Sequence, residues 1–271
     1  MCRVLKVNRS TYYKHFSSHL APRTIENQEI RSRILAIYAH SKKRLGAAKI
    51  KVVLLRDYGI HISTGRVYRL MKGMQLPKMS TRKPRVCTMQ ETQAQCINHL
   101  EQKFNPPGPN QVWVSDITYV GISGGFAYLC AIMDLFSRKI IAFRVHHKMD
   151  SPFVIQTLRQ ALDLRKPDHT ILFHSDRGSQ YTSSSFRKFC DENNITQSFS
   201  KKGYPWDNSV MEAFFKYAKQ EEFSRRNFAN VSEVKMAAFQ YIEGFYNSRR
   251  PHSANQMLTP NEKEVMLRQN I

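Results

Sequence analysis

Three acidic residues lie where their local sequence gives an acid little reason to be. Asp116 interrupts the β-rich stretch 112–120, where aspartate is disfavoured and an unpaired buried carboxylate would be costly. Asp176 directly follows the strand-like run 169–174, and Glu212 lies on a helix-forming stretch, away from its apolar face. Taken singly, each has an ordinary interpretation, namely an edge-strand acid, a turn acid and a solvated helical acid.

Together, the three carboxylates have a chemical purpose. Phosphodiester transfer requires an attacking oxygen to be activated and a leaving oxygen to be stabilised, and two divalent ions about 3.5–4 Å apart do both. Mg²⁺ prefers hard oxygen ligands and retains several waters, so a few carboxylates suffice. We expect Asp116 to bridge two Mg²⁺ ions, with Asp176 completing one site and Glu212 the other. Mn²⁺ is expected to substitute.

Other polar residues near these acids have structural interpretations. Asp134 precedes Arg138 by four residues at a hairpin corner, which predicts a structural ion pair. Asp207 precedes the Glu212 helix and is interpreted as a helix cap. His174 ends a strand, where histidine is more often structural than a support for metal ligands.

The elements expected to position the acids follow an α/β pattern. Strands are predicted over residues 111–120, 126–133, 139–145, 169–174 and 195–199. Helices are predicted over residues 151–164 and 183–193, and again from residue 208. Three consecutive strands followed by alternating helices and strands predict a mixed five-stranded sheet flanked by helices, in the order of the ribonuclease H-like fold.

The first part of the chain is predicted to be a small all-helical domain over residues 24–78. Gly59 is expected to end its second helix, and Ser63 to cap its third. On that third helix Arg66, Arg69 and Lys72 recur every three residues and should face outward together. This pattern favours a DNA recognition helix over an ordinary solvated basic face.

The charge is strongly positive and uneven. The net charge is +21, of which residues 1–105 carry +16 and residues 106–271 carry +5. Such a field attracts a polyanion through counterion release, although a ribosomal protein or a binder of anionic membranes would share it. No apolar run is long enough to span a membrane, and five widely spaced cysteines form no zinc or disulfide pattern. We therefore expect a cytoplasmic protein.

Several motifs resemble one bacterial family. Thirty-five residues separate Asp176 from Glu212, and Lys219 follows two helical turns later on the same face. The longer matching motifs are residues 113–119, 174–181, 203–216 and 246–253. In this order they resemble the orfB transposases of the bacterial insertion sequence 3 family, over nearly the whole chain. One departure is that Asn255-Gln256 stands where the family has Leu-Gly.

The resemblance implies a DDE-type transposase that cuts and rejoins DNA, with Asp116, Asp176 and Glu212 as its metal-binding catalytic triad. It implies double-stranded DNA as partner (element ends and target), a homo-oligomer on DNA, and a possible contribution from the upstream orfA product. That upstream part usually carries a helix-turn-helix and a leucine zipper. Expected DNA contacts in the catalytic half are Lys201, Lys202, Lys216 and Lys219.

The expected domain organisation has five parts. These are a remnant helix-turn-helix segment (1–20), the helical DNA-binding domain (24–78), a basic linker (79–109), a ribonuclease H-like catalytic core (110–227) and a C-terminal helical extension (228–271). The main alternative is a catalytically inactive DNA-binding protein that regulates by occupying element ends. A weaker alternative is a ribonuclease H-type nuclease without strand transfer.

Overall fold

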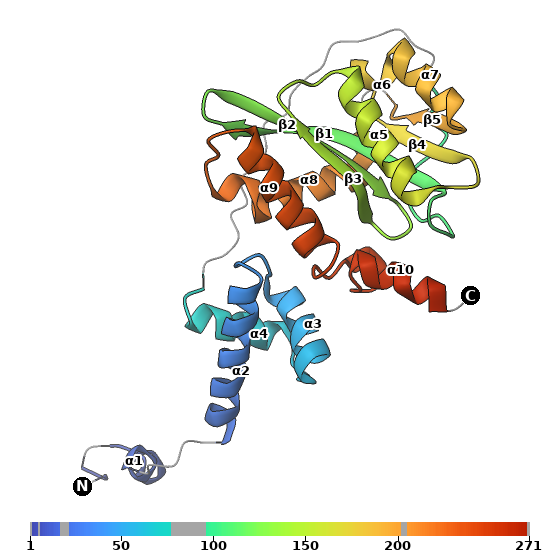
Figure 1. Cartoon of the computed structure of the whole chain (residues 1–271). Coiled ribbons are helices and arrows are strands. Elements are labelled where there is room, and N and C mark those ends of the chain that lie inside the picture. Colours follow the sequence, from blue (N-terminus) through green and yellow to red (C-terminus); the bar gives the residue numbers. More distant parts are fainter. Residues whose placement is uncertain (1, 5, 17–21, 77–95, 202–204, 270–271) are drawn as a thin grey trace. The chain divides into compact units, whose positions relative to one another are not determined.

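The computed structural model divides the chain into two compact units, residues 1–79 and 80–271 (Figure 1). The structure describes residues 2–4, 6–16, 22–76, 96–201 and 205–269. Among these residues, no helix is both long and apolar enough to cross a membrane.

The first unit is helical, as predicted. Its helices are α1 (Arg9–Phe16), α2 (Pro22–His40), α3 (Ala47–Tyr58) and α4 (Thr64–Gly73). Gly59 ends α3 in the left-handed conformation, with φ of 66°. The Ser63 hydroxyl accepts a hydrogen bond from the Arg66 N–H at 3.2 Å and caps α4. The core of the first unit consists of apolar side chains at helical spacing, including Ile30, Ile34, Ile37, Ile50, Leu54, Val67 and Leu70.

The second unit is built on a mixed five-stranded sheet in the order β3-β2-β1-β4-β5. The strands are β1 (Val112–Ile122), β2 (Gly125–Asp134), β3 (Lys139–His146), β4 (Ile171–Ser175) and β5 (Ile195–Phe199). The first three strands pair antiparallel, whereas β1 pairs with β4, and β4 with β5, in parallel. The predicted ribonuclease H-like sheet is confirmed.

Helices cover both faces of this sheet. The α-helices are α5 (Ser151–Arg165), α6 (Ser179–Thr182), α7 (Ser184–Glu192), α8 (Ser209–Glu221), α9 (Val231–Tyr241) and α10 (Pro260–Gln269). Shorter turns are the 3-10 segments Pro205–Asn208, Phe223–Arg225 and Ser253–Asn255 and the π-helical turn Ile242–Tyr246.

Strand alternation assigns these helices to opposite faces. Cys130 and Ile132 of β2 pack in the core that α5 and α7 cover. Ala131 lies between them and therefore points to the other face, where α8 packs against β1 and α9 against β3. Because Asp116 pairs with Ala131, the first acid points to the α8 face.

The segment after α9 makes hydrogen bonds with β3, the strand at one edge of the sheet. The Asn247 side chain accepts from the Ile140 N–H and donates to the Ile140 carbonyl, both at 3.0 Å. The Tyr246 hydroxyl donates to the Arg138 carbonyl at 3.1 Å. An amide side chain here satisfies backbone groups that an edge strand would otherwise expose. The predicted C-terminal extension therefore packs against β3, the edge strand of the sheet.

The predicted linker, residues 79–109, differs from the structure in its second half. The Ile97 carbonyl accepts from the Phe199 N–H at 2.9 Å. The Leu100 N–H donates to the Ser198 hydroxyl at 3.1 Å. These bonds attach the chain from about residue 96 onward to β5, and the linker residues before that point lie outside the described part.

Candidate active site

Asp116 and Asp176 are brought together by the sheet itself. The parallel strands β1 and β4 pair Val114 with His174. Continuing the same register by two residues places Asp116 beside Asp176, just beyond the end of β4. Ligands of open α/β sheets gather at the carboxyl ends of strands. The topology therefore juxtaposes two acids that are far apart in the sequence.

The turn that carries Asp176 is closed by a hydrogen bond and is crowded at Gly178. The Gly178 N–H donates to Oδ1 of Asp176 at 2.9 Å. A Cβ at Gly178 would lie 2.7 Å from Oε1 of Gln180 and 3.0 Å from Oδ1 of Asp176, so the Gln180 side chain would have to shift to accommodate it. The Arg177 side chain donates to the Ser200 carbonyl at 2.8 Å and ties the turn to the end of β5. Asp176 is therefore held in place by its surroundings.

Glu212 lies in the first turn of α8, and the start of this helix is tied to β1. The Asn208 side chain donates to the Ser115 carbonyl, next to the first acid, at 3.3 Å. Glu212 and Lys216 are exposed, and Lys219 on the same helix face is half-buried. The predicted placement of these three residues on one face is confirmed.

The three acids interact electrostatically. Burial and the negative charges of Asp176 and Glu212 raise the pKa of Asp116 to about 8, opposed by the hydrogen bond from Ile117 N–H and by the positive charge of Lys219. Burial also raises the pKa values of Asp176 and Glu212. Within the described residues, Asp116 therefore lies close enough to the other two acids to be repelled by them, and the charge of Lys219 opposes this effect.

This donor set suits a hard divalent cation. All three side chains offer oxygen, and a cation among them would remove both the repulsion and the burial cost that raise the pKa of Asp116. Within the described residues, no three acidic, histidine or cysteine side chains already form a cluster that could hold a metal ion. Glu212 is the most exposed of the three acids.

Lys219 lies beside the acids, as its spacing suggested. Its Nζ is 4.5 Å from the centroid of the Tyr119 ring. Burial lowers the pKa of Lys219, and the charge of Asp116 opposes that shift. Of the two predicted lysines before α8, Lys201 is exposed, whereas Lys202 lies outside the described residues.

The basic face of α4 is smaller than predicted. Arg69 and Lys72 are exposed. The guanidinium of Arg66, however, is half-buried, and it pairs with the carboxylate of Glu26 and the side-chain oxygen of Asn27, both at 2.8 Å. The prediction that all three side chains face outward is therefore wrong for Arg66, whose charge is already partly neutralised by α2.

Asp134 is structural, but not through the predicted partner. Its carboxylate accepts from the backbone N–H groups of Asn110 at 2.8 Å and Phe136 at 2.9 Å. Arg138 instead donates to the Asn105 side chain at 2.8 Å. Backbone donors at the hairpin corner satisfy the acid, so the described structure contains no Asp134–Arg138 ion pair.

Asp207 is not the helix cap that was predicted. The residue before α8 is Asn208, whose side chain makes no capping bond. Asp207 accepts from the side-chain amides of Asn98 at 2.8 Å and Gln102 at 2.9 Å, and from the Lys201 N–H at 2.8 Å. It therefore joins the start of α8 to the segment that precedes β1.

His174 is a structural residue. Its ring nitrogens contact the hydroxyl oxygens of Ser198 at 2.9 Å and Ser200 at 3.2 Å. Burial lowers the pKa of His174 to about 4, so the ring is neutral at pH 7. The interpretation as a structural histidine is supported.

The sequence did not predict a buried ion pair between Glu221 at the end of α8 and Arg250. The guanidinium of Arg250 donates to the carboxylate of Glu221 at 2.8–3.0 Å, and the Tyr241 hydroxyl donates to the same carboxylate at 2.8 Å. Arg250 also lies 4.5 Å from the centroid of the Tyr217 ring, which is partly exposed. The only sequence signal for this pair was the 246–253 motif, which contains Arg250 but does not indicate which residue Arg250 contacts.

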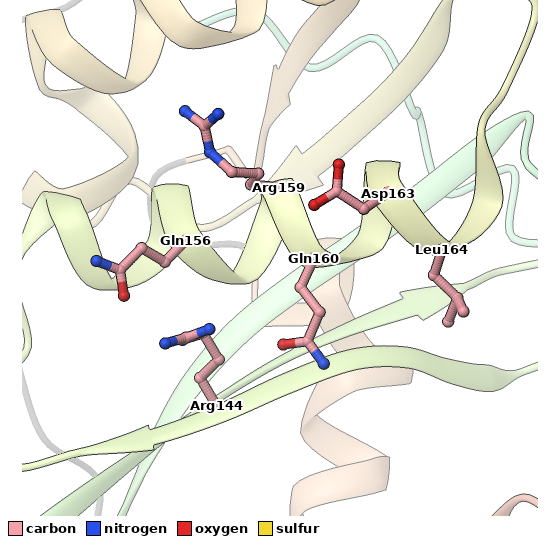
Figure 2. Close-up of a pocket in the computed structure, with 6 residues that line it drawn as sticks. All are labelled: Arg144, Gln156, Arg159, Gln160, Asp163 and Leu164. Carbon is pink, nitrogen blue, oxygen red and sulfur yellow. The ribbon is translucent and has the colours of Figure 1, made fainter.

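A surface hollow of about 510 Å³ between α5 and β3 lies away from the acids (Figure 2). It is lined by Arg144, Gln156, Arg159, Gln160, Asp163 and Leu164. Arg144 pairs with Cys130, which packs on the α5 face, whereas Asp116 points to the α8 face. The hollow and the acidic site therefore open on different faces of the sheet.

Comparison with known families places these features in context. Two models described as "Integrase core domain" match residues 106–205 and 193–260, and a model described as "HTH-like domain" matches residues 25–85. These matches follow the division between the α/β unit, which carries the three acids, and the helical unit.

Curated relatives match over almost their whole length. The chain is 34% identical to the transposase for insertion sequence element IS904 of Lactococcus lactis subsp. lactis (strain IL1403), over 89% of this chain and 95% of the relative. It is 32% identical to transposase InsF for insertion sequence IS3A of Escherichia coli (strain K12), over 97% and 92%. It is also 32% identical to the insertion element IS600 uncharacterized 31 kDa protein of Shigella sonnei, over 96% of both chains. The chain therefore belongs to the family of insertion-sequence transposases that these relatives represent, which are DDE-type polynucleotidyl transferases with an integrase core.

Proposed function

We propose that this transposase cuts DNA at the ends of its mobile element and transfers those ends to target DNA, with Asp116, Asp176 and Glu212 as its catalytic triad. The observation that carries the proposal is the mutual repulsion of these acids, which contributes to raising the pKa of Asp116 to about 8. Holding like charges together in a partly buried site lowers stability, and folds retain such arrangements mainly at functional sites.

The triad would hold two Mg²⁺ ions, with Mn²⁺ able to substitute. Asp116 would contact both ions, Asp176 one and Glu212 the other. When bound, these ions would activate the attacking oxygen and stabilise the leaving oxygen of the phosphodiester. Asp176 is fixed by the Gly178 N–H, so exposed Glu212 would rotate to complete the set.

The chain's own cations would orient double-stranded DNA over the triad. Lys219 is half-buried beside Asp116, and we assign it to the phosphate next to the reacting bond. Lys216 and Lys201 are exposed and would contact the flanking backbone. Loss of Lys219 should therefore reduce joining of terminal nucleotides more than overall DNA affinity. In the helical unit, Arg69 and Lys72 are the exposed cations on α4, and they would contact DNA there.

The test is a cleavage and strand-transfer assay with duplex DNA that carries the element's own ends. The variants Asp116→Asn, Asp176→Asn and Glu212→Gln should each abolish both reactions and leave DNA binding nearly intact. Their effects should not add, because each removes part of one catalytic unit. Glu192→Gln, an exposed acid at the end of α7, is the matched control and should behave as the wild type.

A measurement without catalysis tests metal binding. Mn²⁺ should raise the melting temperature of the wild type and of Glu192→Gln, and should do so much less in the three triad variants. Ca²⁺ should support DNA binding without cleavage because its larger, looser coordination misplaces the reacting oxygens. Full activity in a chelator would overturn the metal-dependent mechanism.

The alternatives give distinct results in the same assays. A regulatory protein that only occupies element ends would bind DNA without cutting it, and the triad variants would change nothing. A nuclease without transfer would cut but never join. We also propose that the enzyme acts as a homo-oligomer on DNA in the bacterial cytoplasm, with the orfA product as partner, which sedimentation with and without DNA and orfA protein would test.

A further inference from the structure

The chain contains two tryptophans in opposite environments. Trp113 lies in the sheet core and is fully buried, whereas Trp206 is 69% exposed. A single exposed apolar residue is common and has no meaning by itself. Trp206 differs because the residues after it are firmly anchored and because they lead directly into the helix of Glu212.

The anchor begins with Asp207, which is 2% exposed. It accepts three hydrogen bonds of 2.8–2.9 Å, two from the side chains of Asn98 and Gln102 and one from the Lys201 N–H. Three bonds to one buried carboxylate fix the 3-10 turn that contains Trp206. The exposed indole is therefore attached to an anchored turn, so binding of a ligand would cost little further backbone entropy.

The same turn, Pro205–Asn208, also sets the position of Trp206 relative to the acids. The Asn208 side chain donates to the Ser115 carbonyl, and Ser115 immediately precedes Asp116. Glu212 follows one turn later on α8. The exposed indole thus belongs to the same short segment that attaches the Glu212 helix beside Asp116.

We infer that Trp206 stacks on an unpaired nucleobase of the DNA strand whose end lies at the triad. This inference rests on the proposed function. A flat indole gains from base stacking without regard to base identity. Within a duplex both faces of a base are covered by its neighbours, so a strand end or a frayed nucleotide offers the exposed face. Residues 106–271 carry a net charge of +5 and present the exposed Lys201 just before this turn, which favours a nucleic acid over an apolar protein partner.

Trp206 provides its own optical signal because Trp113 is shielded in the core. The probes are a 20-base-pair duplex with three unpaired thymidines at one 3′ end and the same duplex with blunt ends. Measurements use the full chain in Ca²⁺, so that no cleavage is required. The duplex with unpaired thymidines should quench the exposed tryptophan emission strongly, and the blunt duplex should quench it weakly.

Substitution separates stacking from general DNA binding. Trp206→Ala should weaken binding to the duplex with unpaired thymidines by roughly 5- to 150-fold and leave binding to the blunt duplex unchanged. Trp206→Phe should retain most of that affinity because a flat ring remains. Unchanged Trp113 emission in both variants would show that the core is intact.

Three results would overturn the inference. One is equal binding of the duplex with unpaired thymidines by Trp206→Ala and the wild type, and another is an equal loss for both duplexes. The third is a change of Trp206 emission with protein concentration in the absence of DNA, which would identify another copy of the chain as the occupant. Quenching by a protein that never cleaves would refute the proposed function while retaining the stacking role.

Discussion

The ion pair between Arg250 and Glu221 should determine whether α8 stays in place. Both side chains are at most 3% exposed, and α8 carries Glu212 and Lys219 on another face. Replacing Arg250 by Met removes the guanidinium and keeps most of its packing volume. Within the described part of the chain, the Tyr241 hydroxyl then remains as a hydrogen-bond donor to the buried Glu221 carboxylate.

Breaking a buried pair by removing one partner typically costs about 3–5 kcal/mol, because a charge is left buried without compensation. A domain is stable by only about 5–15 kcal/mol, so the loss would be a large fraction of the total. Replacing both partners by apolar residues is often neutral. The double variant Arg250→Met with Glu221→Leu should therefore be clearly more stable than the sum of the two single changes predicts.

Guanidinium denaturation followed by Trp113 emission would measure this effect. Trp206→Phe in the background removes the second signal, so that the emission reports the catalytic unit alone. Arg249→Met is the matched control, since Arg249 is exposed and its loss should cost less than about 1 kcal/mol.

Two outcomes would refute the reasoning. A loss of under about 1 kcal/mol for Arg250→Met would show that the pair contributes little to stability. Strict additivity of the two single changes would show that Arg250 and Glu221 do not depend on each other.

Three further predictions concern pH, salt and backbone strain. The pKa of Asp116 is raised from 3.8 to about 8 in the folded state. The metal-free enzyme should therefore lose stability as pH rises from about 4 through 8, by at most about 6 kcal/mol. In Asp116→Asn, the difference in unfolding free energy between pH 5 and pH 9 should be smaller than in the wild type. An unchanged pH dependence would contradict that assignment. In salt titrations, Arg69→Ala and Lys72→Ala should each reduce the slope of log DNA affinity against log salt concentration by about one, if the side chain contacts a phosphate. Arg66→Ala should reduce this slope less, because Glu26 already pairs with Arg66. Equal slopes for all three variants would argue against this distinction. Gln256 occupies the left-handed region with φ of 54°, so Gln256→Gly should stabilise the protein by about 1 kcal/mol in denaturant melts, and a loss of stability would disprove the strain.

The sequence alone was enough to predict the elements and to select three candidate acids. Helix and strand periodicity, and the end signals at Gly59 and Ser63, depend on partners within a few residues, so they are legible without a fold. Asp116, Asp176 and Glu212 could be selected because each conflicts with its local setting, and such conflicts mark functional sites. Their spacing and the surrounding motifs then identified the family, which the comparisons confirm.

Only the tertiary structure decided which distant groups became partners. Arg250 lies 29 residues from Glu221, and Asn247 lies 107 residues from the edge strand that it satisfies. Periodicity specifies which face of an element is buried, but it carries no information about the polar group opposite that face. For the same reason Asp207 and Asp134 were recognised as structural while their partners were misassigned. Those pairings are set by how the C-terminal segment and the segment preceding β1 pack on the sheet, because a buried charge takes whichever donors the packing brings to it.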